Sequence, residues 1–172
     1  MESIVFKKAT LEDVPAIEAV TKKAFAAYAK EIRKQDSVAA LKETRCEILA
    51  DIQKKHVIVC ELDGEIAGAV RFEVLRDGIV YLSRLAIDPD IQSIGIGGLL
   101  LEKVRRECEG LGVRAITLHT ASKMRSSVAF YLKNGYYIHS ITRDKEYIRA
   151  FCVCEIEEMD EMYDYESVVG DR

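Results

Sequence analysis

Residues 79–110 read IVYLSRLAIDPDIQSIGIGGLLLEKVRRECEG, and this stretch decides the fold. The run Ile79–Ile87 is apolar and β-branched and predicts a strand, which Asp88–Asp90 ends. A glycine-rich turn, Gln92–Gly98, follows directly. Apolar residues then recur at helical spacing and predict a helix that ends at Gly110. The stretch is therefore a strand, a turn and a helix in immediate succession.

The chain before this stretch predicts one strand, two helices and an antiparallel meander. Thr10 and Asp13 have the spacing of a capping box, and Asp63-Gly64 is a strong hairpin signal. The expected elements are a strand within Met1–Ala9, a helix from Thr10 to about Lys30, a helix from about Ser37, and strands at His56–Leu62 and Glu65–Leu75.

The chain after the stretch predicts a further strand and helix and then two final strands. The expected elements are a strand at Val113–Thr120, a helix capped by Ser122 that closes at Asn134-Gly135, and strands at Tyr136–Arg143 and Glu146–Ile156. The full order is β-α-α-β-β-β-α-β-α-β-β. An antiparallel meander that leads into a β-α-β-α unit predicts an α/β (α+β) fold, with a mixed, largely antiparallel sheet flanked by helices.

The domain organisation expected is one domain over residues 1–156, without repeats or linkers. Residues 157–172 are acidic and rich in tyrosine, with little apolar periodicity. They are expected to form an acidic C-terminal tail, either mobile or an arm on a partner.

Composition argues against several classes of protein. A net charge of −4 and a pI near 5.5 disfavour a nucleic-acid binder, and no apolar run reaches the length of a membrane span. The five cysteines are an odd number in apolar surroundings, which indicates reduced, buried thiols. Cys152 and Cys154 match no usual zinc spacing, so no metal site is expected. The default interpretation is a cytoplasmic protein that binds neither membrane nor nucleic acid.

The turn Gln92–Gly98 has the features of an anion site. Glycines let the backbone approach a ligand, and the start of the next helix offers unpaired N–H groups and the positive end of its dipole. A Walker loop needs Lys-Ser/Thr after its last glycine, but Leu99-Leu100 follows here. The dinucleotide fingerprint fails because Leu100 stands three residues after Gly97. Taken alone, such glycines are as often close-packing residues.

A second motif makes the interpretation more specific. Gln92, Gly95 and Gly97 match Gln/Arg-x-x-Gly-x-Gly/Ala, and Ala129–Tyr136 is similar to Ala-x-Leu-Tyr-x-x-x-Gly-Phe. With these two motifs at the proper separation, the sequence from Ile4 to Ile156 resembles the GNAT superfamily of N-acetyltransferases. The resemblance implies acetyl-CoA as cosubstrate and a primary amine of a small molecule or peptide as acceptor. The amine is expected to attack the thioester directly.

The resemblance implies that the cofactor is held mainly by backbone. Leu85 and Ile87 would bond the pantetheine arm like an added strand, and the Ile87 N–H is a candidate to polarise the thioester carbonyl. The turn would wrap the pyrophosphate. The implied cofactor-binding residues are Leu85, Ala86, Ile87, Gln92, Ser93, Ile94, Gly95, Ile96, Gly97 and Gly98.

Tyr131 matches the family tyrosine that protonates the departing thiolate. A phenol is a neutral proton donor at pH 7, although a ring packed in the core is the alternative. Many relatives carry an asparagine seven residues earlier, where this chain has Met124. That contact is then absent, or Ser122, Ser126 or a water molecule supplies it.

The general base is left open by the sequence. The usual glutamate position on the fourth strand is Ser83 here. The candidates are Glu73, His119 and Tyr81, with water connected to bulk solvent as a further alternative.

The acceptor is also left open. Arg84 and Tyr28 are candidates to line its site, and equally to be a solvated arginine and a packing tyrosine. The resemblance also allows a homodimer. Two alternatives to an enzyme stay in view: an acyl-CoA sensor or interaction module without catalysis, and a nucleotide-binding domain of another fold.

Overall fold

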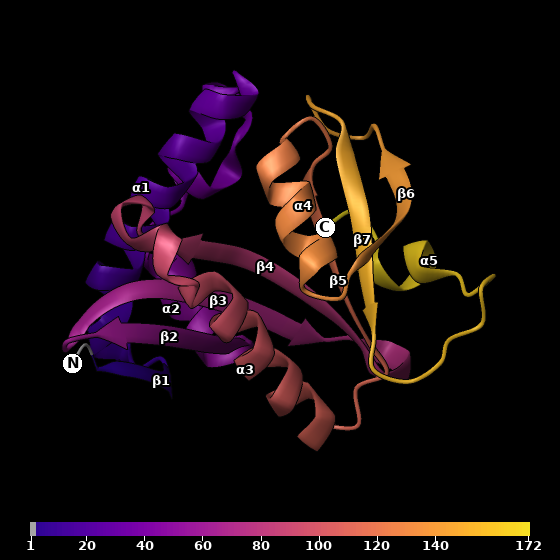
Figure 1. Cartoon of the computed structure of the whole chain (residues 1–172), viewed down its shortest axis with the longest axis horizontal. Coiled ribbons are helices and arrows are strands. Elements are labelled where there is room, and N and C mark those ends of the chain that lie inside the picture. The colour runs from indigo at the N-terminus through magenta and orange to yellow at the C-terminus, as the bar shows by residue number, and fades with distance from the viewer. Residues whose placement is uncertain (1–2) are drawn as a thin grey trace. The chain divides into compact units, whose positions relative to one another are not determined.

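The computed structural model describes residues 3–172, apart from the side chain of Ser93. Within them, seven strands form one mixed sheet in the order β1-β2-β3-β4-β5-β7-β6 (Figure 1). The strands are β1 (Ile4–Lys8), β2 (His56–Leu62), β3 (Glu65–Val74), β4 (Ile79–Ile87), β5 (Ala115–Ala121), β6 (Tyr137–Thr142) and β7 (Arg149–Glu155). The sheet is largely antiparallel and carries helices, so the predicted fold class is confirmed.

The pairing of the strands shows where the sheet changes direction. β1 pairs with β2, and β7 pairs with both β5 and β6, in antiparallel fashion. β4 pairs with β5 in parallel, over Ile79–Tyr81 against Ala115–Thr117. β4 continues to Ile87 beyond this short ladder.

The α-helices α1 to α4 lie in connections between these strands, and α5 follows the last strand. They are α1 (Val14–Ile32), α2 (Arg45–Lys54), α3 (Ile96–Gly110), α4 (Arg125–Lys133) and α5 (Tyr165–Val169). Thr10 and Asp13 form the predicted capping box before α1, and Gly135 with φ +89° follows α4 as predicted. Within the described part of the chain, no helix combines the length and the apolar character that a membrane crossing requires.

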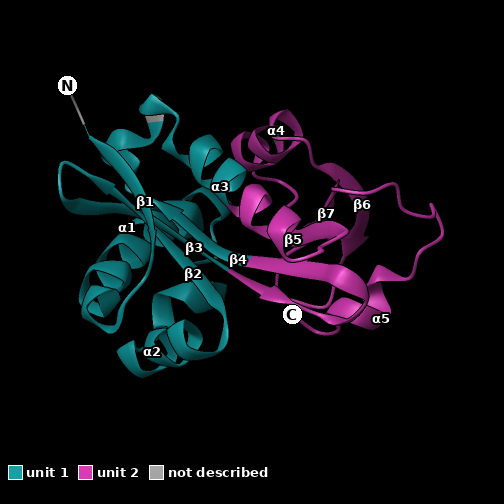
Figure 2. Cartoon of the chain, turned by 90° about the horizontal axis from the view of Figure 1, so that it is seen from below, with its two compact units in different colours: residues 1–71, 83–103 teal, residues 72–82, 104–172 magenta. Residues whose placement is uncertain are grey.

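The chain divides into two compact units (Figure 2). Unit 1 comprises Met1–Arg71 and Ser83–Lys103, and unit 2 comprises Phe72–Leu82 and Val104–Arg172. β3 and β4 therefore contribute residues to both units. The single domain over residues 1–156 stays a prediction.

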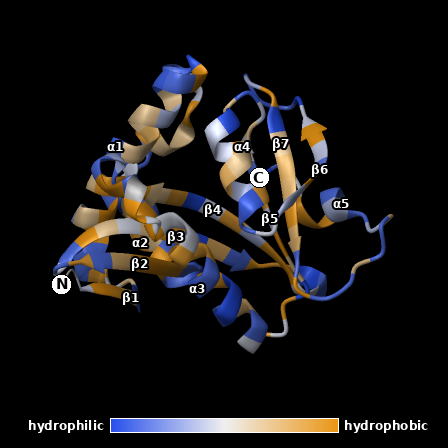
Figure 3. Ribbon diagram, in the orientation of Figure 1, coloured by the Kyte–Doolittle hydropathy of each residue, from blue (hydrophilic) through white to orange (hydrophobic). Residues whose placement is uncertain are grey.

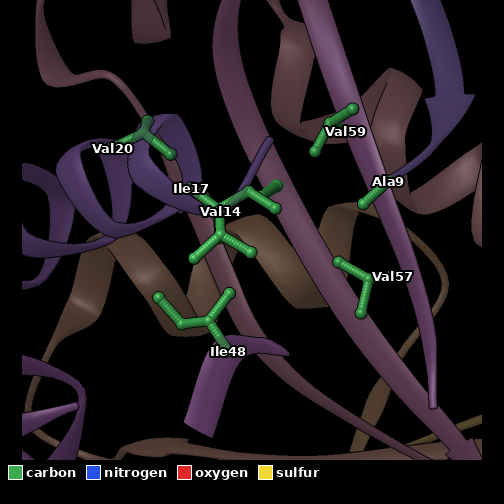
Figure 4. Close-up of a cluster of buried hydrophobic side chains, with 8 residues drawn as sticks. Ala9, Val14, Ile17, Val20, Ile48, Val57 and Val59 are labelled. Atoms are coloured by element: carbon green, nitrogen blue, oxygen red, sulfur yellow. The ribbon is translucent and has the colours of Figure 1, made fainter. Parts of the chain in front are cut away.

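The core of unit 1 joins two helices to the strands. Val14 and Ile17 of α1, Ile48 of α2, and Val57 and Val59 of β2 are buried in one cluster (Figure 4). The helical residues come from apolar positions spaced three or four apart, which fall on one face of a helix. Burial of this face holds α1 and α2 in place.

The core of unit 2 includes the C-terminal segment. Met159, Tyr165, Val168 and Val169 are buried against Phe151 and other residues of the sheet. Strand β7 is largely hydrophobic, whereas the last turns of α3 are hydrophilic (Figure 3). The expectation of a mobile or arm-like tail is wrong, because residues 157–172 complete this core.

Three other local expectations need correction. The second helix does not begin near Ser37: two 3₁₀ turns come first, and α2 begins after Thr44, which forms a capping box with Glu47. Ser122 does not cap α4, because its hydroxyl donates to the Ile148 carbonyl (3.1 Å). All five cysteines are free, but Cys46 is exposed rather than buried.

Candidate functional site

The glycine-rich turn of unit 1 lies between the end of β4 and the start of α3. A 3₁₀ turn, Pro89–Ile94, begins where the Asp88 carboxylate accepts the Asp90 N–H (3.0 Å). Gly95 then has φ +80°, in the left-handed region where glycine carries no steric penalty. A Cβ placed on Gly95 would meet no atom within 4 Å, so the turn is open at this point.

The first turn of α3 presents backbone N–H groups. The Leu99 N–H donates a hydrogen bond to the Gly95 carbonyl (3.3 Å). It is the first backbone amide of this helix that bonds in the helical pattern. The amides of Ile96–Gly98 precede it and have no acceptor within the helix. The buried Ile96 side chain anchors this end of the helix, while Gln92 is exposed. The Ser93 side chain, also expected here, lies outside the described part of the chain.

Lys23 forms ion pairs with two carboxylates beside this turn. Its ammonium group contacts Asp88 and Asp90, each at 2.7 Å. The hydrogen bond to Asp88, followed by the one to Asp90, raises the pKa of Lys23, and the same contact lowers the pKa of Asp88. The single positive charge of Lys23 offsets one of the two negative charges, so an anion at the turn would meet less repulsion than beside two unpaired carboxylates. Sequence patterns carry no signal for Lys23, because its contact with Asp90 joins residues 67 positions apart.

The strand end Leu85–Ile87 is packed tightly against β3. A Cβ on Gly68 would lie 2.7 Å from Ile87 Cδ1 and 3.2 Å from the Ala86 carbonyl oxygen, so a larger residue would require the Ile87 side chain to move and the Ala86 backbone to shift slightly. Ala86 and Ile87 are themselves buried. Gly68 thus supports the strand that is expected to bind pantetheine, and it was missed because its role depends on a neighbour in space.

Tyr131, in unit 2, is the candidate acid. It lies on α4, is 8% exposed, and packs its ring against Phe130 and Tyr136 at centroid distances of 5.1 and 5.6 Å. These edge-to-face contacts fix the plane of the ring. Near the start of the same helix, Ser127 is hydrogen-bonded to Thr120 (2.7 Å).

Tyr81 and His119, two of the candidate bases, are in direct contact. The Tyr81 hydroxyl lies 2.9 Å from His119 Nδ1, and the imidazole packs against Phe151. Burial, reinforced by the positive charge of Arg149, lowers the pKa of His119 to about 4. The imidazole is therefore neutral at pH 7 and able to accept a proton.

We expect this buried imidazole to make the protein sensitive to acid. The unfolded His119 takes up a proton near pH 6.5, whereas the folded state resists protonation until about pH 4. Stability is thus present above pH 6.5 and is lost as the pH falls through this window, by about 3 kcal/mol. Urea unfolding at several pH values measures the loss. His119→Gln should unfold with a shallower pH dependence, and an unchanged dependence would contradict the prediction.

Glu73, the third candidate base, makes no contact with His119 in the described part of the chain. Both of its carboxylate oxygens bind the Arg172 guanidinium, at 3.1 and 3.3 Å. A proton acceptor role for Glu73 would require this ion pair to open.

The two residues expected to line an acceptor site both lie in unit 1 with defined contacts. Arg84 Nε is 3.3 Å from Glu43 Oε1, and its side chain is half-buried. Tyr28 packs near Ala29 and Val38 and makes an edge-to-face contact with Phe25 (5.7 Å). Their part in acceptor binding stays a prediction.

Comparison with known proteins identifies a family. The family model described as the acetyltransferase (GNAT) family matches residues 21–136. A relative, "Uncharacterized protein YxbD" of Bacillus subtilis (strain 168), is 32% identical over 74 residues. That match covers 43% of this chain and 45% of the relative, so it spans less than half the length of either.

Solved structures with the same fold are numerous, and three examples that are similar over most of the chain follow. The PaiA N-acetyltransferase of Thermoplasma acidophilum, in complex with coenzyme A, is 17% identical with a TM-score of 0.78, covering 89% of this chain and 99% of its own. The Escherichia coli ribosomal-protein-S18-alanine N-acetyltransferase is 20% identical with a TM-score of 0.73, covering 95% and 99%. The putative acetyltransferase yncA of Salmonella typhimurium, with acetyl-CoA, is 16% identical with a TM-score of 0.73, covering 92% and 96%.

Proposed function

Because the chain belongs to the acetyltransferase (GNAT) family, we propose that it transfers the acetyl group of acetyl-CoA to a primary amine of a small molecule or peptide. The observation that carries the proposal is the turn Gln92–Gly98, where Gly95 is left-handed and open and the first amides of α3 have no intrahelical acceptor. The coenzyme A bound to PaiA and the acetyl-CoA bound to yncA support the same ligand here.

The residues of unit 1 fit a coenzyme A pyrophosphate and arm. Backbone amides of the turn would hold the phosphate oxygens, since an anion at a helix N-terminus needs only such donors and the helix dipole. Lys23 would keep Asp88 and Asp90 from repelling the phosphates. The backbone of Leu85–Ile87 would hold the arm, with the Ile87 N–H as the donor that polarises the thioester carbonyl.

Acetyl-CoA supplies an activated thioester, which the amine is proposed to attack directly without an acyl-enzyme. Tyr131 is proposed to donate its phenolic proton to the leaving sulfur, and its packed ring limits the positions that the hydroxyl can take. The Tyr81–His119 pair is proposed to take the proton that the amine loses as its nitrogen bonds to the acetyl carbon. His119 is neutral at pH 7, although its pKa of about 4 makes it a weak base, whereas both carboxylate oxygens of Glu73 are bonded to Arg172.

Gly95→Ala tests the turn. We expect the free energy of unfolding to fall by about 1 kcal/mol, because alanine is disfavoured at φ +80°, and the affinity for coenzyme A to fall several-fold. Urea unfolding and calorimetric titration measure the two effects. Gly110→Ala is the matched control: its Cβ also meets no atom within 4 Å, but Gly110 is helical, so the change should be neutral or stabilising. Equal effects of the two substitutions would contradict the role of Gly95.

The choice of base is tested by paired variants. His119→Gln should lower kcat about tenfold, because removal of a weak base costs less than removal of a well-matched one. Glu73→Gln should leave kcat within about twofold. Steady-state rates at saturating amine measure kcat for both variants. If Glu73→Gln loses more kcat than His119→Gln, the base is Glu73.

The function itself is tested by thiol release. The chain is incubated with acetyl-CoA and a panel of primary amines, and free coenzyme A is measured with a thiol reagent while acetylated amine is identified by mass spectrometry. Amine-dependent turnover supports the enzyme and excludes the acyl-CoA sensor. If coenzyme A binds but no amine is acetylated, the sensor is favoured. If ATP or NAD raises the melting temperature more than coenzyme A does, a nucleotide-binding domain is favoured.

A further inference from the structure

Glu43 joins two arginines from neighbouring strands. It follows the 3₁₀ turn Ala39–Lys42, just before α2, and is 9% exposed. Its Oε2 accepts a hydrogen bond from Arg71 Nη2 (2.8 Å), and its Oε1 accepts from Arg71 Nη1 and from Arg84 Nε (3.3 Å). Arg71 belongs to β3 and is 1% exposed, and Arg84 belongs to β4. One carboxylate therefore connects the segment before α2 to two strands of unit 1.

The charges in this cluster are nearly matched. Asp51 of α2 also accepts from Arg71 Nη1 (2.9 Å), which gives two arginines and two carboxylates. Burial disfavours the charge on Arg71, but the bonds to Glu43 and then Asp51 outweigh it and raise the pKa of the guanidinium. Among the residues that the structure describes, Glu43 alone is hydrogen-bonded to both arginines. Loss of its charge would leave Arg84 without its carboxylate and Arg71 with Asp51 alone.

Arg84 has an unfavourable backbone conformation in the middle of a strand. Its φ is +54°, in the left-handed region, although it is not glycine and lies within β4. Such a conformation is sterically disfavoured for a non-glycine residue and persists only where its surroundings enforce it. The side-chain bond from Arg84 to the buried Glu43 supplies such enforcement.

The strained residue immediately precedes Leu85–Ile87. A change of φ at Arg84 would rotate the peptide groups that follow it, and strand side chains that alternate in direction would be redirected as well. Farther along, Ala86 and Ile87 are held by close packing on Gly68. The direction of the Leu85 backbone groups is thus set between two fixed points, Arg84 and Gly68.

We propose that Glu43 is a positioning residue that holds Arg84 in its left-handed conformation and thereby aims the backbone of Leu85–Ile87 for the acyl-CoA arm. The inference rests on the proposed function for its ligand, and on unit 1 alone for its structural part. Glu43 touches neither the cosubstrate nor the reacting atoms in this account. It acts through Arg84.

A comparison of Glu43→Gln with Asp51→Asn tests the proposal. Both variants remove a carboxylate from Arg71, but only Glu43→Gln removes the partner of Arg84. We expect the dissociation constant of coenzyme A to rise about tenfold in Glu43→Gln and to change less than twofold in Asp51→Asn, even where melting temperatures fall equally. Equal losses of affinity would show that Glu43 only stabilises the fold, and would overturn the proposal.

A double-mutant cycle with Arg84→Gly gives a second test. Glycine adopts φ +54° without strain and has no side chain for Glu43 to hold. In the Arg84→Gly background, Glu43→Gln should therefore change coenzyme A affinity less than twofold. A tenfold loss in both backgrounds would contradict action through Arg84.

Amide hydrogen exchange separates this inference from the proposed function. In the protein without ligand, a peptide that contains Leu85–Ile87 should exchange several-fold faster in Glu43→Gln than in Asp51→Asn. If the unmodified chain binds no coenzyme A, the proposed function fails, but the exchange rates still decide whether Glu43 orders this strand. If binding is normal and the exchange rates of the two variants are equal, the inference alone fails.

Discussion

Tyr131→Phe should lower kcat between about a hundredfold and a thousandfold, with little change in the affinity for coenzyme A. Removal of the hydroxyl deletes the proposed proton donor to the leaving sulfur, and general acid catalysis is typically worth a factor of this size. The ring remains, so its contacts with Phe130 and Tyr136 are kept and the melting temperature should hardly move. Rates of thiol release at saturating acetyl-CoA and amine measure kcat, and calorimetric titration measures affinity.

Tyr136→Phe is the matched control for this experiment. Tyr136 is also a buried tyrosine, its ring lies 5.6 Å from that of Tyr131, and burial raises its pKa well above the usual value. Its hydroxyl has no proposed chemical role, so kcat should stay within about twofold. A Tyr131→Phe variant that keeps its full kcat would leave Tyr131 a packing residue. If kcat and melting temperature fall together in both variants, Tyr131 is likewise a packing residue and not the acid.

The sequence was most informative where structure depends on neighbouring residues. The strand Ile79–Ile87, the Asp63-Gly64 hairpin and the stop at Gly135 are each set by a few adjacent side chains, and the structure has all three. The position of the turn Gln92–Gly98 is predictable for the same reason, because glycine spacing and a following helix are local features. The prediction for the second helix was less accurate, because apolar periodicity from Val38 onward concealed the Thr44–Glu47 cap.

The supporting contacts of the candidate site could not be predicted from the sequence, because they join residues far apart in the chain. Glu43 and Arg84 are 41 positions apart, and Tyr81 and His119 are 38 apart. Sequence patterns report on which face a residue lies, but not on which polar groups meet there. Sequence patterns therefore leave the base open among Glu73, His119, Tyr81 and water, and the proposal chooses among the side chains from their contacts.

Composition was misleading at the C-terminal segment. Its acidic residues suggested a solvated tail, yet Tyr165, Val168 and Val169 have the spacing of one helical face. That face belongs to a helix of only five residues, and Gly170, with φ +63°, ends α5. A helix this short has little stability alone and forms because tertiary packing covers it. The short apolar pattern was a signal, but it depended on a core that the sequence could not place.

Tyr165→Ala should therefore lower the free energy of unfolding by about 3 to 5 kcal/mol, the range for an aromatic core residue. Tyr165 is 1% exposed, and its ring contacts those of His139, Tyr163 and Phe151. Removal of the ring therefore leaves a cavity in the core where α5 packs on the sheet of unit 2. Urea denaturation measures the change.

The control for this substitution lies in the same segment. Met162 is 87% exposed, and Met162→Ala should alter the free energy of unfolding by no more than about 0.5 kcal/mol. A mobile acidic tail predicts small effects for both substitutions, whereas a packed segment predicts a large effect for Tyr165 alone. Near-equal midpoints of unfolding would thus overturn the packed arrangement. A large difference between the two variants in free energy of unfolding would show that residues 157–172 fold as part of unit 2. Removal of a side chain costs the full transfer and cavity energy only where that side chain is buried in the native state.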